Sequence, residues 1–198
     1  VTSGGRERVE LQILGQHQIA NALAAAAAAT AFGLDIRTIA EGLSEHSVMS
    51  KWRMELHQIG DITIINDAYN SNPESCIAAL QTLRQLTQER GGRSWAFLGK
   101  MHELGDSSDQ LHNEVGASAL ASNIDNLIVI AEPAFLAGLS STSTFMKSVS
   151  DWQAACRFLS QVESGDVILI KGSRAEKLDL LAIETLNFFK NKYEGENQ

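Results

Sequence analysis

The feature that most constrains the fold is the alternation of short apolar runs with longer helix-like segments from Ile62 onward. The apolar runs are rich in β-branched residues and are bounded by short polar loops, as buried strands are. Strands are expected at residues 62–65, 93–98, 126–131, 144–147 and 166–171. Helices are expected at residues 73–89, 109–120, 133–139, 151–162 and 175–190. This order predicts an α/β domain built on a doubly wound, mostly parallel sheet.

The residues before this alternation predict a small helical segment. Residues 16–32 are rich in Ala, which has the highest intrinsic helix propensity. A second helix is expected at residues 36–43, with Asp35 as its cap. Residues 9–14 alternate apolar and polar side chains, which predicts a strand ahead of these helices.

A linker and a β-hairpin connect the two parts of the chain. Residues 44–51 are polar and lack clear periodicity, so we interpret them as an interdomain linker. Residues 52–59 alternate like a strand, and Gly60 with Asp61 turns the chain into the strand at 62–65. The 198 residues, 44% of them hydrophobic, suffice for one complete domain and part of another.

Composition argues against several classes of function. The formal net charge is −8, and no cluster of Lys and Arg offers a surface to nucleic acid or to an anionic membrane. This charge balance makes a cytoplasmic protein the expectation. No stretch is apolar and long enough to span a bilayer. Cys76 and Cys156 lack metal-binding spacing and are expected to be buried thiols. The first residue, Val1, is not an initiator Met, so the chain is expected to begin within a longer polypeptide.

The best candidate for a site is the loop that follows the strand at 62–65. Residues 66–72 read NDAYNSN, and Pro73, with Ser71 or Asn72 as a cap, should begin the next helix. Ligands of open α/β sheets bind outside the carboxyl ends of strands, where the loops after neighbouring parallel strands gather. Asn, Asp, Ser and Pro also form ordinary turns, so the residues alone leave both a ligand site and a turn open.

Other polar residues could also contact a ligand. Arg53, at the end of the linker, could hold a phosphate through two parallel hydrogen bonds or form an ordinary surface salt bridge. His17 and Asn21 lie four residues apart on one face of the Ala-rich helix, where they could contact a ligand or be purely structural. The loops at 99–108 and 172–174 also follow strands, but no GxxxxGK[ST] phosphate loop occurs in the chain.

Five motifs, in order, resemble those of the Mur ligase family. They are GQHQIANALAAAA, KWR at residues 51–53, NDAYNSNPES, LGKMHELG and LIKGSR. The resemblance covers essentially the whole chain. It implies that residues 1–48 are the tail of a central ATP-binding domain and that residues 49–198 form a Rossmann-like carboxy-terminal ligase domain. An amino-terminal UDP-sugar-binding domain and the phosphate loop would then lie upstream of this chain.

The resemblance also implies a reaction and its partners. In this family, with ATP and Mg²⁺, a carboxylate is phosphorylated and an amine then attacks the acyl phosphate to form an amide. The motifs are most similar to those of enzymes that join D-alanyl-D-alanine to UDP-N-acetylmuramoyl-tripeptide in peptidoglycan precursor synthesis. The ligands of Mg²⁺ are expected outside this chain, and the chain alone is expected to be inactive. Neither nucleic acid nor a membrane is an expected partner.

Individual roles follow from the family motifs. His17 and Asn21 are similar to the motif residues at the adenine of ATP, although Gln18 stands where the family usually has Asn. Arg53 matches the residue that reaches the phosphates of ATP, and Asp67 matches the acid at the ribose. The resemblance therefore makes Arg53 and Asp67 the expected catalytic residues as well as nucleotide-binding ones.

The substrate-binding residues are implied by two loops. The YNxNP loop, near the reacting groups, contains Tyr69, Asn70 and Asn72, and the KGSR loop, beside the incoming dipeptide, contains Lys171, Ser173 and Arg174. Lys100 replaces an Asp of the family pattern, so no catalytic role is assigned to it. Two alternatives stay open: a folylpolyglutamate-synthase-like or other Mur-type amino-acid ligase, and a non-catalytic Rossmann-like binding module.

Overall fold

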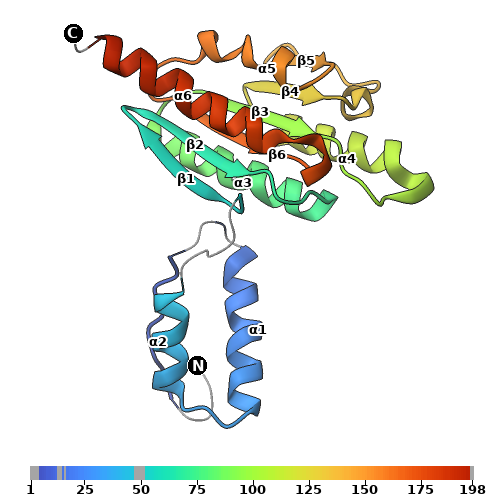
Figure 1. The fold of residues 1–198 in the computed structure, drawn as a ribbon. Helices are drawn as coiled ribbons and strands as arrows, with labels where there is room; N and C mark the ends of the chain where they lie inside the picture. The colour runs from blue at the N-terminus through green and yellow to red at the C-terminus, as the bar shows by residue number, and fades with distance from the viewer. Residues whose placement is uncertain (1–4, 13–14, 16, 47–51, 197–198) are drawn as a thin grey trace. The chain divides into compact units, whose positions relative to one another are not determined.

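The computed structural model describes residues 5–12, 15, 17–46 and 52–196. The chain divides into two compact units, residues 1–50 and 51–198 (Figure 1). The predicted domain boundary, between residues 48 and 49, lies outside the described residues and stays a prediction. No helix in the described part is long and apolar enough to cross a membrane.

The first unit contains two helices, α1 (His17–Ala31) and α2 (Ile36–Glu45), which confirm those expected from the sequence (Figure 1). Asp35 caps α2, because its Oδ1 accepts two backbone N–H groups of the first turn at 3.0 and 3.1 Å. The strand expected at 9–14 is wrong for its described residues, 9–12, which are not in a strand. A strand requires a hydrogen-bonded neighbour, and the described residues of this unit supply no ladder to 9–12.

The second unit is built on a six-stranded sheet. Its strands are β1 (Glu55–Ile59), β2 (Ile62–Asp67), β3 (Ser94–Gly99), β4 (Asn126–Ile130), β5 (Phe145–Val149) and β6 (Val167–Lys171). They lie in the order β1-β2-β6-β3-β4-β5, and every neighbouring pair except β1 with β2 is parallel. The α/β class and the mostly parallel sheet are therefore confirmed.

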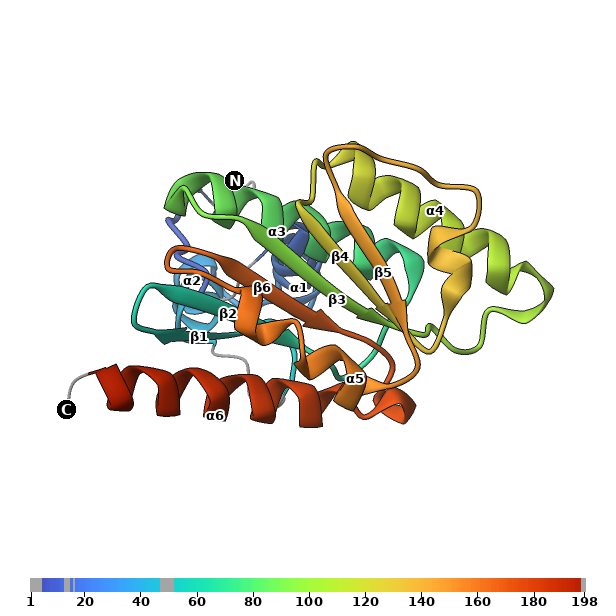
Figure 2. The ribbon, with the colours of Figure 1, turned by 90° about the horizontal axis from the view of Figure 1, so that it is seen from above.

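Helices cover both faces of the sheet. One face carries α3 (Pro73–Arg90) and α4 (Ser108–Ala121), and the other carries α5 (Trp152–Cys156) and α6 (Leu178–Glu196) (Figure 2). The strands β2 and β6 are neighbours, yet α3 follows β2 on one face and α6 follows β6 on the other. The other neighbour of β6, β3, is followed by α4 on the α3 face. The sheet is thus doubly wound, and its topological switch point lies at β6.

The hairpin differs from its predicted form at one end. β1 begins at Glu55 rather than at Trp52, because Trp52 and Met54 have left-handed φ values of 65° and 48°. A strand cannot continue through that conformation. The turn at Gly60 and the antiparallel pairing of β1 with β2 are as expected.

Three predicted helices are shorter or shifted. Residues 133–139 form only a 3₁₀ turn, η2 (Pro133–Leu136), and residues 151–162 form α5 followed by the 3₁₀ turn η3 (Leu159–Gln161). The last helix begins at Leu178, after the 3₁₀ turn η4 (Arg174–Glu176). Lys177 interrupts the helical path there, with a φ of 54°.

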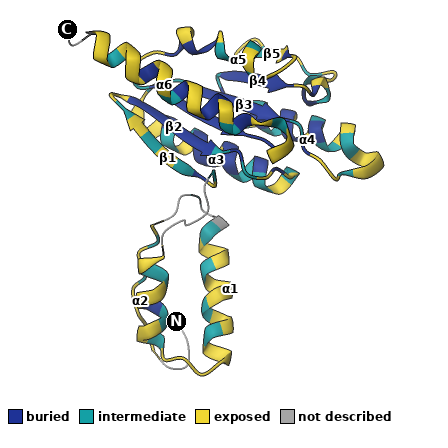
Figure 3. Cartoon of the chain, viewed as in Figure 1, coloured by how far each residue is buried: buried dark blue, intermediate teal, exposed yellow. Residues whose placement is uncertain are grey.

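The central strands form the core of the second unit (Figure 3). Almost every residue of β2, β3, β4 and β6 is buried, which fixes the carboxyl ends of these strands relative to one another. Cys76 of α3 is buried as expected, whereas Cys156 is only half-buried.

Candidate functional site

The predicted site loops meet at the carboxyl edge of the sheet. In the parallel register, Lys171 at the end of β6 is paired with Asp67 of β2 on one side and with Leu98 of β3 on the other. The loops after β2, β3 and β6 therefore start side by side, which confirms the predicted convergence. The switch point, where doubly wound sheets bind ligands, lies at the same edge.

Lys171 is a buried cation at the centre of this edge. Its side chain is 1% exposed, and its Nζ donates to Asp67 Oδ2 at 2.6 Å and to the Asn70 carbonyl at 2.9 Å. An ammonium group is rarely buried unless it is paired. The ion pair therefore fastens the loop after β2 to the end of β6, a structural role that the sequence did not reveal.

Asp67 is held from a second direction by the residues that precede β1. Its Oδ1 accepts the backbone N–H of Met54 at 3.2 Å. The carbonyl of Trp52 accepts the backbone N–H of Tyr69 at 3.1 Å. Both contacts depend on the left-handed backbone at Trp52 and Met54, which turns this segment toward the loop after β2. The Asp67 side chain remains 13% exposed and can still present an oxygen to a ligand.

Two arginines at this edge lie on aromatic rings. The guanidinium carbon of Arg53 lies 4.1 Å from the centre of the Tyr69 ring, and that of Arg174 lies 5.3 Å from the Trp52 ring. Both arginines are exposed, and neither pairs with a carboxylate among the described residues. A stacked guanidinium keeps its N–H donors available for a planar anion such as a carboxylate or a phosphate.

The loop after β3 contributes a second ion pair. Lys100 Nζ lies 2.9 Å from Glu132 Oε2, and Glu132 Oε1 accepts the backbone N–H of Ala134 at 3.2 Å. Burial raises the pKa of Glu132, but hydrogen bonds from Lys100 and Ala134 outweigh burial and lower that pKa overall. The hydrogen bond to Glu132 raises the pKa of Lys100. The charge of Lys100 is thus balanced within the protein.

Ser173 joins the loops after β6 and β3. It is buried, its backbone N–H donates to the Lys100 carbonyl at 3.4 Å, and its Oγ accepts the backbone N–H of His102 at 3.3 Å. The ring of His102 contacts Glu176 Oε1 at 2.6 Å. Since Oγ accepts from the protein, the Ser173 hydroxyl proton remains available for a ligand oxygen.

Close backbone packing supports this junction. A Cβ added to Gly99 or to Gly172 would lie 2.7 Å from Leu178 Cδ1, so glycine permits the close approach of the two loops. The buried side chain of His112 braces the first loop, because its Nε2 accepts the Met101 N–H at 2.9 Å. Its Nδ1 must then carry the proton, which it donates to a backbone carbonyl of α4 at 2.7 Å.

The loop after β2 is an ordered helix start as well as a site candidate. Asn72 Oδ1 accepts the N–H of Ser75 at 2.8 Å and Ser75 Oγ accepts the N–H of Asn72 at 3.2 Å, so Asn72 is the cap of α3. Asn70 Oδ1 accepts the N–H of Ser71 at 2.8 Å. The Ser71 hydroxyl lies 3.0 Å from the Cys76 thiol, whose pKa is raised by burial.

The predicted adenine residues belong to the first unit. Both lie on α1. The side chain of His17 is outside the described residues. Asn21 is exposed, and its Nδ2 donates to Gln18 Oε1 at 2.9 Å. The role carried over to these two residues stays a prediction.

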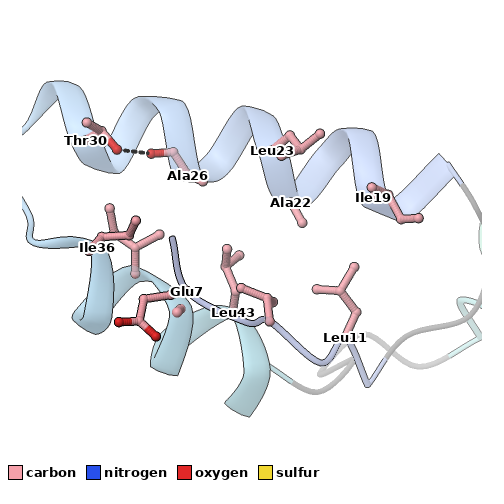
Figure 4. A pocket seen from close by; sticks show the side chains of 12 residues that line it. Glu7, Leu11, Ile19, Ala22, Leu23, Ala26, Thr30, Ile36 and Leu43 are labelled. Atoms are coloured by element: carbon pink, nitrogen blue, oxygen red, sulfur yellow. Dashed lines mark hydrogen bonds between the residues drawn. The ribbon is translucent and has the colours of Figure 1, made fainter. Parts of the chain in front are cut away.

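The first unit also contains an apolar groove of about 350 Å³ between α1, α2 and the preceding chain (Figure 4). Leu11, Ile19, Leu23 and Leu43 contribute to its lining, and Ile19 and Leu23 are more than half exposed. Its lining is mostly apolar and contains a single ionic side chain, Glu7. Among the described residues, no group of three His, Cys, Asp or Glu side chains could hold a metal ion.

Sequence reasoning missed two residues of the site. Trp52 was expected inside a strand, and a left-handed backbone at a bulky residue has no sequence signature. Glu132 lies two residues after the end of β4 and precedes Pro133, so the rule that placed the other polar loops at strand ends could have found it.

Several known proteins are similar to this chain in sequence. A family model described as "Mur ligase, glutamate ligase domain" matches residues 52–174. The UDP-N-acetylmuramoyl-tripeptide--D-alanyl-D-alanine ligase of Mycobacterium tuberculosis (strain CDC 1551 / Oshkosh) is 32% identical over 196 residues, which cover 88% of this chain and 38% of that protein. The Bacillus subtilis (strain 168) protein of the same name is 36% identical over 175 residues, covering 85% of this chain and 38% of its own.

A solved structure shows the same fold. The crystal structure of MurF from Acinetobacter baumannii superposes with a TM-score of 0.83 and 30% sequence identity. The match covers 94% of this chain and 41% of that one. The chain thus spans less than half the length of these three relatives.

Proposed function

The chain belongs to the Mur ligase family, and on that premise we propose that it is the carboxy-terminal part of an ATP-dependent ligase. The proposed enzyme joins D-alanyl-D-alanine to UDP-N-acetylmuramoyl-tripeptide in peptidoglycan precursor synthesis. Relatives with that printed name match most of this chain at about a third identity, which supports the choice of substrates.

The main observation behind the proposal is that Arg53 and Arg174 stack on aromatic rings and have no carboxylate partner among the described residues. Both guanidinium groups lie at the carboxyl edge of the sheet, on aromatic rings, without a carboxylate partner in the described part of the chain. Each substrate of the proposed reaction carries an anionic group: the phosphates of ATP, the carboxylate to be activated and the carboxylate of the dipeptide. Uncommitted guanidinium groups are the side chains best suited to bind them.

The proposed reaction makes an amide in two steps. The terminal carboxylate of the tripeptide takes the γ-phosphoryl group of ATP, and ADP is released. The amine of D-alanyl-D-alanine then attacks the acyl carbon, and phosphate leaves as the amide forms. Mg²⁺ would neutralise phosphate charge in the first step, through ligands that we expect outside this chain.

The residues of this chain would bind, orient and shield these groups. Arg53 would neutralise charge on the phosphates, and Asp67 would accept a hydrogen bond from the ribose. Lys171 would act mainly through Asp67, because its buried ion pair fixes the orientation of that carboxylate. Ser173 and Arg174 would bind the dipeptide.

The loop after β2 would face the reacting groups. Among the described residues, the Tyr69 hydroxyl and the Asn70 amide NH₂ have no hydrogen-bond partner, so both could contact a substrate. Asn72 uses its side-chain oxygen as the α3 cap, and its amide NH₂ is what could reach a ligand.

The first unit would be the end of the central ATP-binding domain. In that role His17 and Asn21 would contact adenine, and the phosphate loop, which this chain lacks, would lie upstream. The 198-residue chain alone should therefore have no ligase activity. Because the reaction consumes ATP and a UDP-linked precursor, we place the enzyme in the cytoplasm.

An ADP-release assay on the full-length protein tests the proposal. With UDP-N-acetylmuramoyl-tripeptide and ATP, D-alanyl-D-alanine should support turnover, while glutamate and diaminopimelate should not. Turnover with glutamate or diaminopimelate instead would favour a folylpolyglutamate-synthase-like or other Mur-type amino-acid ligase, and the description of the matching family model is compatible with a glutamate ligase. ATP binding without turnover on any amine would favour a binding module, and turnover by the 198-residue chain alone would overturn the division of roles.

A further inference from the structure

Trp52 connects three parts of the site. Its indole lies 5.3 Å from the guanidinium of Arg174, in the loop after β6. Its carbonyl accepts the N–H of Tyr69, and the Tyr69 ring lies under Arg53. Trp52 thus contacts both Tyr69, on which Arg53 stacks, and the side chain of Arg174.

The position of the Trp52 ring is fixed by its surroundings. It is half-buried and packs against the hydrophobic core of the second unit. Its φ of 65° is unusual for a bulky residue, and such a backbone persists only where surrounding contacts determine it. The hydrogen bonds at Tyr69 N–H and Met54 N–H are contacts of this kind.

A second Arg–Trp pair, Arg93 with Trp95, differs from Arg174 with Trp52 in whether the arginine donors are already occupied. Arg93 lies 5.6 Å from the Trp95 ring, but its guanidinium also donates to Asp166 and to the Gln161 carbonyl. The donors of Arg93 are therefore committed to the fold. Arg174 has no such partner in the described ranges, so its stacking on Trp52 orients donors that remain available.

Resting on the proposed function, we propose that Trp52 is a positioning residue that holds the Arg174 guanidinium ready for the carboxylate of the incoming dipeptide. Trp52 itself does not touch the reacting atoms. Its indole limits the rotamers of a long, exposed side chain, so that less freedom is lost when the carboxylate binds.

Kinetics of the full-length enzyme test this role. Trp52→Leu should raise the KM for D-alanyl-D-alanine about twofold to fivefold, because the loss of a partly exposed cation–π contact weakens binding by about that factor. The KM for ATP should change little. Trp52→Phe should restore most of the difference. In Arg174→Ala, adding Trp52→Leu should cause no further rise, because Trp52 acts through Arg174. Arg157→Ala, which removes the guanidinium from the Phe158 ring, is the matched control and should change nothing.

A second measurement does not depend on turnover. In the 198-residue chain, the NMR signal of the Arg174 side-chain Nε–H, assigned with Arg174→Lys, should carry a ring-current shift that Trp52→Leu removes and Trp52→Phe keeps. An unshifted signal, additive effects on KM, or an unchanged KM in Trp52→Leu would each overturn the inference. If wild type shows the ring-current shift but does not use D-alanyl-D-alanine, the proposed function fails instead.

Discussion

Lys171→Met should destabilise the second unit strongly, because it breaks the buried ion pair while keeping most of the side-chain volume. The Lys171 side chain is 1% exposed and that of Asp67 is 13% exposed, so water can replace the lost ammonium only in small part. Removing one partner of a buried pair costs about 3–5 kcal/mol, since the other charge stays buried without compensation. At about 2–4 °C per kcal/mol for a chain of this size, Tm should fall by about 6–20 °C.

Urea unfolding of the 198-residue chain, followed by circular dichroism, measures this loss. Lys147→Met, at an exposed position on the edge strand β5, is the matched control and should change stability by less than about 0.5 kcal/mol. Combining Lys171→Met with Asp67→Asn should recover part of the loss, because the neutral amide needs no cation. Equal midpoints for Lys171→Met and Lys147→Met would show that the pair does not hold the two loops together.

Three further predictions concern other parts of the site. In the full-length protein, if it has the proposed ligase activity, Arg53→Ala should lower kcat about tenfold to a hundredfold, because a charged hydrogen bond contributes about 1.5–3 kcal/mol. Tm should not change, and an unchanged kcat would exclude Arg53 from the proposed mechanism. The fold lowers the pKa of the Glu132 carboxyl. The ionised carboxylate therefore stabilises the folded state above its unfolded pKa of about 4.3, and this stabilisation is lost as the pH falls through the folded pKa. Glu132→Gln should therefore lose less stability than wild type between about pH 5 and pH 3 in urea unfolding. Asn72→Ala should lower the free energy of unfolding by about 0.5–2 kcal/mol, whereas Asn72→Ser should keep most of it.

The order of strands and helices was predictable because each element of the second unit has its own local pattern. The β-branched run before Asn66, the Pro at the start of α3 and the apolar run of β6 are each read within a few residues. The edge at which the loops gather then followed from parallel pairing and right-handed crossovers. These rules alone place Asp67 and Lys171 at one edge.

The contacts within the site were not predictable from the same patterns. The sequence indicates that Lys171 ends a strand, but its ion pair with Asp67 depends on the register of two strands more than 100 residues apart. The left-handed turn at Trp52 is likewise set by tertiary contacts that override an alternating strand pattern. The strand expected at 9–14 fails in its described residues, 9–12, for the opposite reason: a local pattern cannot form a strand without a partner, and the described residues of the first unit supply none.

The cations at the sheet edge are of two kinds: lysines paired with carboxylates, and arginines stacked on aromatic rings. This difference bears on how an acidic chain could bind anions there. Lys171 and Lys100 are each neutralised by a carboxylate of the protein, Asp67 and Glu132, and so serve the loops rather than a ligand. A buried ammonium requires such a partner, whereas a guanidinium on an aromatic ring keeps both its charge and its planar donors. Arg53 and Arg174 occupy that second situation. The positive potential open to a substrate therefore comes from the arginines, and an anion that binds here should leave both ion pairs intact.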